Sequence, residues 1–227
     1  MAKKKSNICA YCGGLDPTTK DHIPPRNLFP KPRPSNLITV PCCKSCREGW
    51  SDDDEYFRAA IVSARETCKN KYAQQVNEKL LRSMYNPSKS GFANLIRSSL
   101  MEVDIQSKGG IYLGNAPAIK VKKLRFDRVA QRIIRGLFFY EKKYPLPKNY
   151  QVENRFYQFD FNDIVSSLGP APFVELRMIG DNIFNYTFAT CIDDPNSTVW
   201  LSVFFQGLPF MGYTFKPERV NKPNQFD

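Results

Sequence analysis

Four cysteines and the only histidine of the chain lie close together near its start. Cys9 and Cys12 form one Cys-x-x-Cys pair, and Cys43 and Cys46 form a second. Each pair can give two thiolates to one metal ion, and four thiolates complete the tetrahedral shell of a structural zinc. Such a closed site has no position for a substrate, so we expect Zn2+ to support folding and other residues to carry any chemistry.

Two other interpretations of these cysteines are a redox-active Cys-x-x-Cys and unrelated free thiols. Two correctly spaced pairs in a chain that we expect to be cytoplasmic favour zinc over both. Cys42 directly precedes Cys43, but a pair counted from Cys42 would have Ser45 as its second member, so the Cys43 register is preferred. Cys68 and Cys191 are expected to be reduced and buried.

Between the two pairs lies Asp21-His22-Ile23-Pro24-Pro25. An imidazole titrates near neutral pH and can act as a base, and a carboxylate is a hard ligand suited to Mg2+ or Mn2+. Adjacent residues of a strand point to opposite faces, so Asp21 and His22 can share one site only if the strand is distorted or ends there, as Pro24-Pro25 would favour. The plainer interpretation is a structural histidine, or one that supports the zinc ligands.

These residues, in this order, resemble the zinc-containing HNH endonucleases. The resemblance rests on the two cysteine pairs, on the Asp21-His22 segment and on Asn36-Leu37-Ile38-Thr39-Val40-Pro41, which runs into Cys43. It implies a ββα-metal motif, in which two antiparallel strands precede a helix. It also implies that His22 activates water, that Asp21 binds a catalytic Mg2+ or Mn2+, and that Asn36 orients His22.

The resemblance implies a nuclease that cleaves phosphodiester bonds, with DNA favoured over RNA, in a setting such as restriction or anti-phage defence. One position departs from the pattern, because the residue after the last zinc cysteine is usually Asn or His and here is Arg47. A guanidinium has no free lone pair for a cation. Glu48 is the nearest substitute ligand, and Arg47 can instead hold the scissile phosphate. The alternative is a catalytically degenerate HNH scaffold that binds nucleic acid or a protein partner.

An acidic run, Asp52-Asp53-Asp54-Glu55, follows this motif. With Ser51 as N-cap and Asp54 at the third helical position, these residues are typical of a helix start, where acidic side chains complement the helix dipole. We prefer this interpretation to metal binding.

The charge of the chain favours a nucleic-acid partner. There are 33 Lys and Arg residues against 22 Asp and Glu, which gives a net charge of +11. Lys31 and Arg33 stand in a proline-rich segment, where they could flank a substrate or belong to a plain spacer. Helical spacing places four arginines on one face of a helix, where they could follow a phosphate backbone or form an ordinary solvated surface. These arginines are Arg125, Arg128, Arg132 and Arg135.

The remaining pattern predicts an α+β protein with three parts: the HNH motif (1–60), a mainly helical segment (61–150) and a C-terminal antiparallel sheet (151–227). Periodicity predicts helices over 51–84, 91–102 and 126–143, with a short strand at 111–113. Strands are predicted over 173–179, 183–192 and 198–206, the last of them central. Their aromatic side chains are expected in the core, and the sheet could carry a protein partner or a ligand. No segment is apolar enough to cross a membrane.

Overall fold

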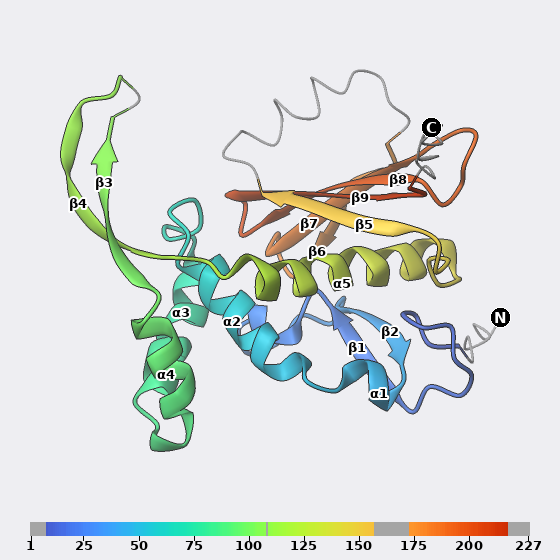
Figure 1. Ribbon diagram of the computed structural model, residues 1–227, viewed down its shortest axis with the longest axis horizontal. Coiled ribbons are helices and arrows are strands. Elements are labelled where there is room, and N and C mark those ends of the chain that lie inside the picture. Colours follow the sequence, from blue (N-terminus) through green and yellow to red (C-terminus); the bar gives the residue numbers. More distant parts are fainter. Residues whose placement is uncertain (1–7, 108, 157–172, 218–227) are drawn as a thin grey trace, which may run out of the picture.

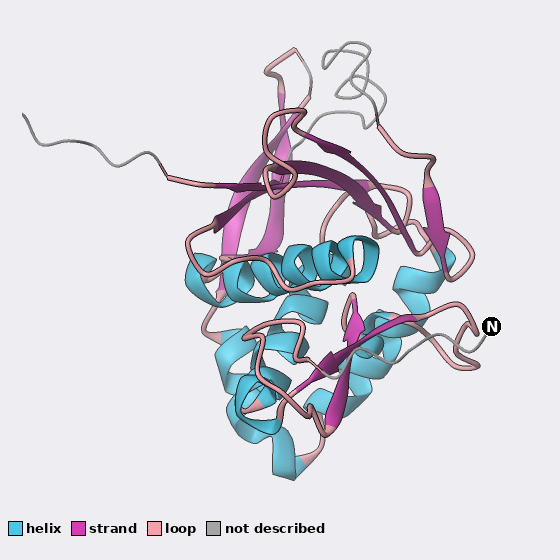
Figure 2. Ribbon diagram, turned by 90° about the vertical axis from the view of Figure 1, so that its right-hand side faces the viewer, coloured by secondary structure: helices cyan, strands magenta, loops and turns pink. Residues whose placement is uncertain are grey.

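A computed structural model describes residues 8–107, 109–156 and 173–217. The fold has three layers, with the long helix α5 (Lys123–Lys142) in the middle (Figures 1 and 2). A five-stranded antiparallel sheet covers one side of α5, and an N-terminal hairpin with the shorter helices covers the other. The expected α+β arrangement of N-terminal hairpin, central helices and C-terminal sheet is confirmed.

The C-terminal sheet has the strand order β5-β9-β8-β7-β6. Its strands are β5 (Gln151–Phe156), β6 (Arg177–Ile179), β7 (Phe184–Thr190), β8 (Thr198–Phe204) and β9 (Leu208–Phe215). The prediction that the 198–206 strand is central is confirmed, and aromatic residues such as Trp200 and Phe184 are fully buried. Strands β5 and β9 were not predicted, because β5 is largely polar and β9 contains Pro209 and Gly212, residue types that strands disfavour.

The predicted helix over 51–84 is in fact two helices, α2 (Trp50–Val62) and α3 (Lys71–Met84). The side chain of Asn70 accepts hydrogen bonds from the backbone of Tyr72 and Ala73 and so starts α3 as its N-cap. Ser51 is not the N-cap of α2. That position belongs to Gly49, whose φ of 77° suits a residue without Cβ.

The predicted helix over 91–102 is shorter than expected. It is α4 (Ser90–Arg97), preceded by a 3-10 turn, η2 (Pro87–Lys89), and the chain then forms the hairpin of β3 (Leu100–Gln106) and β4 (Tyr112–Ile119). This hairpin projects from the body (Figure 1), and side chains such as Tyr112 and Leu113 are largely exposed. No helix in the described part of the chain has the length and apolar character needed to span a membrane.

Helix α5 joins the sheet to the N-terminal hairpin because it packs on both. Ile134 lies against Gly212 of β9, and a Cβ at Gly136 would come within 2.4 Å of Ile23 in the N-terminal hairpin. A residue without a side chain is therefore required where the hairpin approaches α5. One contiguous core cluster includes buried side chains from Ala10 to Phe210, so the N-terminal motif and the sheet share their packing.

Candidate functional site

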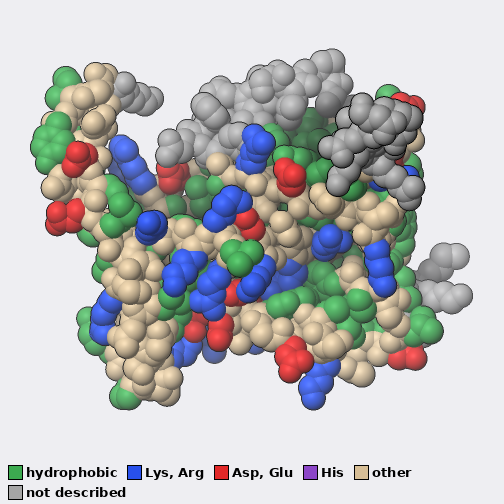
Figure 3. Space-filling view, viewed as in Figure 1, with side chains coloured by type: hydrophobic (Ala, Val, Ile, Leu, Met, Phe, Trp, Pro, Cys, Tyr) green, Lys and Arg blue, Asp and Glu red, His purple; other side chains and the backbone are tan. Residues whose placement is uncertain are grey.

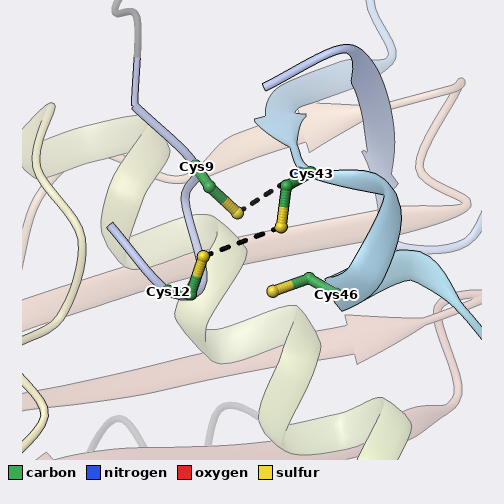
Figure 4. A group of neighbouring side chains, drawn as sticks. All are labelled: Cys9, Cys12, Cys43 and Cys46. Carbon is green, nitrogen blue, oxygen red and sulfur yellow. Dashed lines mark hydrogen bonds between the residues drawn. The ribbon is translucent and has the colours of Figure 1, made fainter. Parts of the chain in front are cut away.

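The four predicted zinc ligands converge on one point. The Sγ atoms of Cys9, Cys12, Cys43 and Cys46 all lie within 4.8 Å of one another (Figure 4). A zinc ion with Zn–S bonds of about 2.3 Å needs sulfur atoms roughly 3.8 Å apart, and the Sγ atoms of Cys12 and Cys43 are separated by 3.7 Å. The cluster is consistent with a structural Zn2+.

Local backbone structure positions these thiols. Cys9 and Cys12 lie in a tight turn closed by the bond from Cys9 N to Gly14 O, and Cys43 is the N-cap of the short helix α1 (Lys44–Arg47), which contains Cys46. Backbone amides donate to two of the sulfurs, from Cys43 N to Cys9 Sγ at 3.4 Å and from Gly14 N to Cys12 Sγ at 3.4 Å. Such bonds stabilise thiolates, as a metal site requires.

The neighbouring cysteines do not join the cluster. Cys42 is fully buried in the core, and burial raises the pKa of its thiol to about 12. The hydroxyl of Ser45 instead lowers the pKa of Cys43 to about 6, so Cys43 favours the thiolate. The choice of Cys43 over Cys42 is thus supported. Cys68 and Cys191 are both exposed, so the prediction that they are buried is wrong.

Asp21 and His22 lie on β1 (Thr19–Ile23), which pairs in regular antiparallel register with β2 (Ile38–Cys42). The strand has no distortion at Asp21 or His22. Burial alternates as a regular strand requires, because Asp21 and Ile23 are buried whereas His22, opposite Thr39, is half-buried.

Asp21 and His22 nevertheless line one open cavity. Its volume is about 1250 Å³, which exceeds the roughly 300–1,000 Å³ of a typical small-molecule pocket. Its lining residues come from the β1–β2 motif and the start of α2. They include Asp21, His22, Arg26, Arg33, Arg47, Trp50 and Asp54.

The carboxylate of Asp21 is held by three groups. The Tyr11 hydroxyl donates to its Oδ2 at 2.5 Å, and the backbone amide of His22 donates to its Oδ1 at 3.0 Å. Arg132 Nε lies 3.4 Å from Oδ2 as an ion pair, although its N–H is not aligned for a hydrogen bond. The same guanidinium donates to Asp54 and lies 4.3 Å from the Trp50 ring centroid. Residues distant in sequence thus meet beneath the cavity.

The surroundings of His22 favour its neutral form. Burial and the positive charge of Arg26 lower the pKa of the imidazole, with smaller contributions of the same sign from Arg47 and Arg33, and Asp21 opposes them. A neutral imidazole has a free lone pair at neutral pH and can accept a proton. Burial also raises the pKa of Asp54 to about 6, against the attraction of Arg132.

Three predicted site residues of the N-terminal motif lie away from this cavity. The side chain of Asn36 donates to Met178 O and accepts from Gly180 N, so it fastens the β1–β2 loop to the C-terminal sheet. Among the described residues, no hydrogen bond connects this side chain to His22. Glu48 is exposed and is not among the cavity-lining residues. Lys31 is likewise exposed outside the lining, whereas Arg33 and Arg47 face the cavity.

The predicted arginine stripe on α5 is largely neutralised by the acidic run of α2. Arg125 and Arg128 pair with Asp53, and Arg132 pairs with Asp54. Arg132 is only 5% exposed, so the expectation that it lies on a free phosphate-binding face is wrong. Arg128 remains 60% exposed and Arg135 is half-buried. Figure 3 shows the Lys and Arg side chains along the middle of the molecule with acidic side chains among and below them.

Sequence reasoning missed three members of the site: Tyr11, Arg26 and Trp50. Only Arg26 carried a signal, because it directly follows the Asp21-His22-Ile23-Pro24-Pro25 segment. The comparisons with known proteins add no assignment: no family model matches the chain, and no curated protein or solved structure matches it.

Proposed function

We propose that this chain is a metal-dependent endonuclease of the HNH type, in which His22 takes the proton from the attacking water. One observation carries the proposal: a half-buried imidazole biased to its neutral form lines an open cavity beside Asp21 and several arginines. A base of this kind must be held on a rigid support. The regular β1–β2 hairpin and the four-cysteine cluster supply that support.

The cavity also offers carboxylates for a catalytic divalent cation. Mg2+ is commonly held by one or two carboxylates together with substrate phosphate and water, and Asp21 and Asp54 fit this donor set. Asp54 thereby takes the role considered for Glu48. When bound, the cation supplies neutralisation of charge on the phosphate and the leaving oxygen. Because Arg132 already balances both carboxylates, we expect the cation to bind weakly in the absence of nucleic acid.

In the proposed reaction His22 accepts a proton from water as the water oxygen attacks the phosphorus. The bond from phosphorus to the leaving oxygen breaks, and the leaving oxygen takes its proton from solvent. Arg47 is positioned by its bond to Lys20 O at 3.4 Å and faces the same cavity, where its fork of donors can hold a phosphate oxygen. DNA is the proposed substrate on the grounds of the HNH resemblance.

Plasmid cleavage tests this proposal. We expect the protein to nick supercoiled plasmid with Mg2+ or Mn2+, and His22→Ala to lower the rate by roughly 10²–10⁴-fold, the usual contribution of a general base. Added imidazole should restore part of the lost activity. Asp54→Asn should lower the rate as well, whereas Glu48→Gln, which removes an exposed acidic charge close to the motif, should not. Binding of DNA without cleavage under either metal would overturn the enzyme assignment.

Two observations favour a second candidate, a degenerate scaffold that only binds nucleic acid. Asp21 already has three partners, and Arg47 occupies the position of a usual metal ligand. This candidate predicts salt-dependent binding that His22→Ala does not change, and no cleavage.

A further inference from the structure

The arginines that line the cavity lack the acidic partners that six other arginines have. In the described part of the chain, Arg26 and Arg33 have neither an ion pair nor a side-chain hydrogen bond, and Arg47 bonds only to a backbone carbonyl. Among the other described arginines, Arg65, Arg97 and Arg135 also have no ion pair, but carboxylates neutralise six guanidinium groups. Those paired arginines are Arg58, Arg82, Arg125, Arg128, Arg132 and Arg177.

The acidic residues of the cavity do not balance this charge. Three carboxylates line it, those of Asp16, Asp21 and Asp54, but the last two are held by Arg132. Asp16 alone then faces Lys20 and the three arginines. Like charges gathered around one cavity repel one another, and an anion placed among them relieves that repulsion.

The three arginines reach the cavity from separate segments of the motif. Arg26 begins the 3-10 turn η1 (Arg26–Leu28), Arg33 lies in the loop between the two strands, and Arg47 ends α1. All three side chains are exposed and so accessible to a ligand. Guanidinium groups bind phosphate through paired hydrogen bonds, which makes a phosphodiester strand the anion that suits three separate cations.

We propose that Arg26, Arg33 and Arg47 form a three-point clamp that holds three phosphates of a nucleic-acid strand in the cavity without a divalent cation. The clamp rests on the proposed function for the identity of its ligand. In this proposal the arginines bind the nucleic acid, and the divalent cation is needed only for cleavage. Binding and cleavage can therefore be tested separately.

The test is fluorescence anisotropy of a labelled DNA duplex in buffer freed of Mg2+ and Mn2+ by a chelating resin. Each clamp contact should contribute about 0.9 to the slope of log affinity against log salt. Arg26→Gln, Arg33→Gln and Arg47→Gln should each lower that slope by about 0.9 and the affinity by roughly fivefold at 0.15 M salt. Arg82→Gln, in the exposed pair with Glu78, removes the same charge at a residue that does not line the cavity and should leave the slope unchanged.

Equal slopes in the three variants and in Arg82→Gln would overturn the clamp, even if the protein cleaves DNA. A loss of slope in the clamp variants without any cleavage by the wild type would support the clamp and overturn the nuclease. Dependence of all binding on Mg2+ or Mn2+ would also overturn the clamp. Melting temperatures equal to that of the wild type would establish that the exposed substitutions leave the fold intact.

Discussion

Replacing Arg132 by methionine should destabilise the whole protein, because its guanidinium is the shared partner of two carboxylates under the cavity. The side chain of Arg132 is 5% exposed, and those of Asp21 and Asp54 are 10% and 22% exposed. Solvent therefore screens these charges little. Removing one member of a buried ion pair costs about 3–5 kcal/mol, since the remaining charge is left without a partner.

For a protein of this size, 1 kcal/mol corresponds to a shift of about 2–4 °C in melting temperature. We therefore expect Arg132→Met to melt about 6–20 °C below the wild type at pH 7. Arg132→Lys keeps the charge but not the forked donors. Its melting temperature should therefore lie between those of the wild type and Arg132→Met. Combining Arg132→Met with Asp21→Asn and Asp54→Asn should recover much of the loss, because no charge then remains buried.

The deficit of Arg132→Met should depend on pH through Asp54. Burial already raises the pKa of this carboxyl to about 6, and loss of the neighbouring cation raises it further. A raised folded-state pKa disfavours folding above the unfolded value, and the penalty falls as pH drops through the folded value. Urea denaturation followed by circular dichroism should show a smaller deficit at pH 5 than at pH 8. A deficit below about 1 kcal/mol, or no recovery in the triple variant, would refute the reasoning.

Two further predictions concern the supports of the site, and a third concerns the loop between β7 and β8. Cys46→Ser should lower the melting temperature and abolish the one zinc per chain expected by atomic absorption, whereas Cys68→Ser, at an exposed thiol, should do neither. Gly136→Ala should lower the free energy of unfolding by about 1–3 kcal/mol because its Cβ would overlap Ile23. Gly91→Ala, with open space around it, should not lower it. Equal urea midpoints for these two variants would contradict the tight contact at Gly136. The Ser197 hydroxyl, followed by the Asn196 amide and Tyr150, lowers the pKa of Asp194, so its stabilising effect is present above the unfolded pKa and is lost as pH falls through the folded one. The wild type should thus have a higher urea midpoint than Asp194→Asn at pH 7, and this difference in midpoint should shrink below about pH 4. A difference that does not change with pH would exclude stabilisation by the Asp194 carboxylate.

Local spacing was enough to predict the four-cysteine cluster and the long helix. A Cys-x-x-Cys turn brings two sulfurs together whatever surrounds it, and two such turns flanking a hairpin meet when the hairpin closes. Apolar periodicity likewise predicted α5, and β-branched and aromatic residues predicted β7 and β8. In each case neighbours in the sequence carry the physical cause.

Only the tertiary structure decided which charges are free. The sequence shows an acidic run and an arginine stripe as separate features, but Asp53 and Arg125 are 72 positions apart and meet because α2 packs on α5. The same packing places Arg132 under Asp21 and removes it from the surface. Arg26 and Arg33 stay unpaired although η1 packs on α2, because the side chains of Asp53 and Asp54 pair with arginines of α5. Charge pairing between distant elements depends on the packing of the whole chain, and no local pattern of residues encodes it.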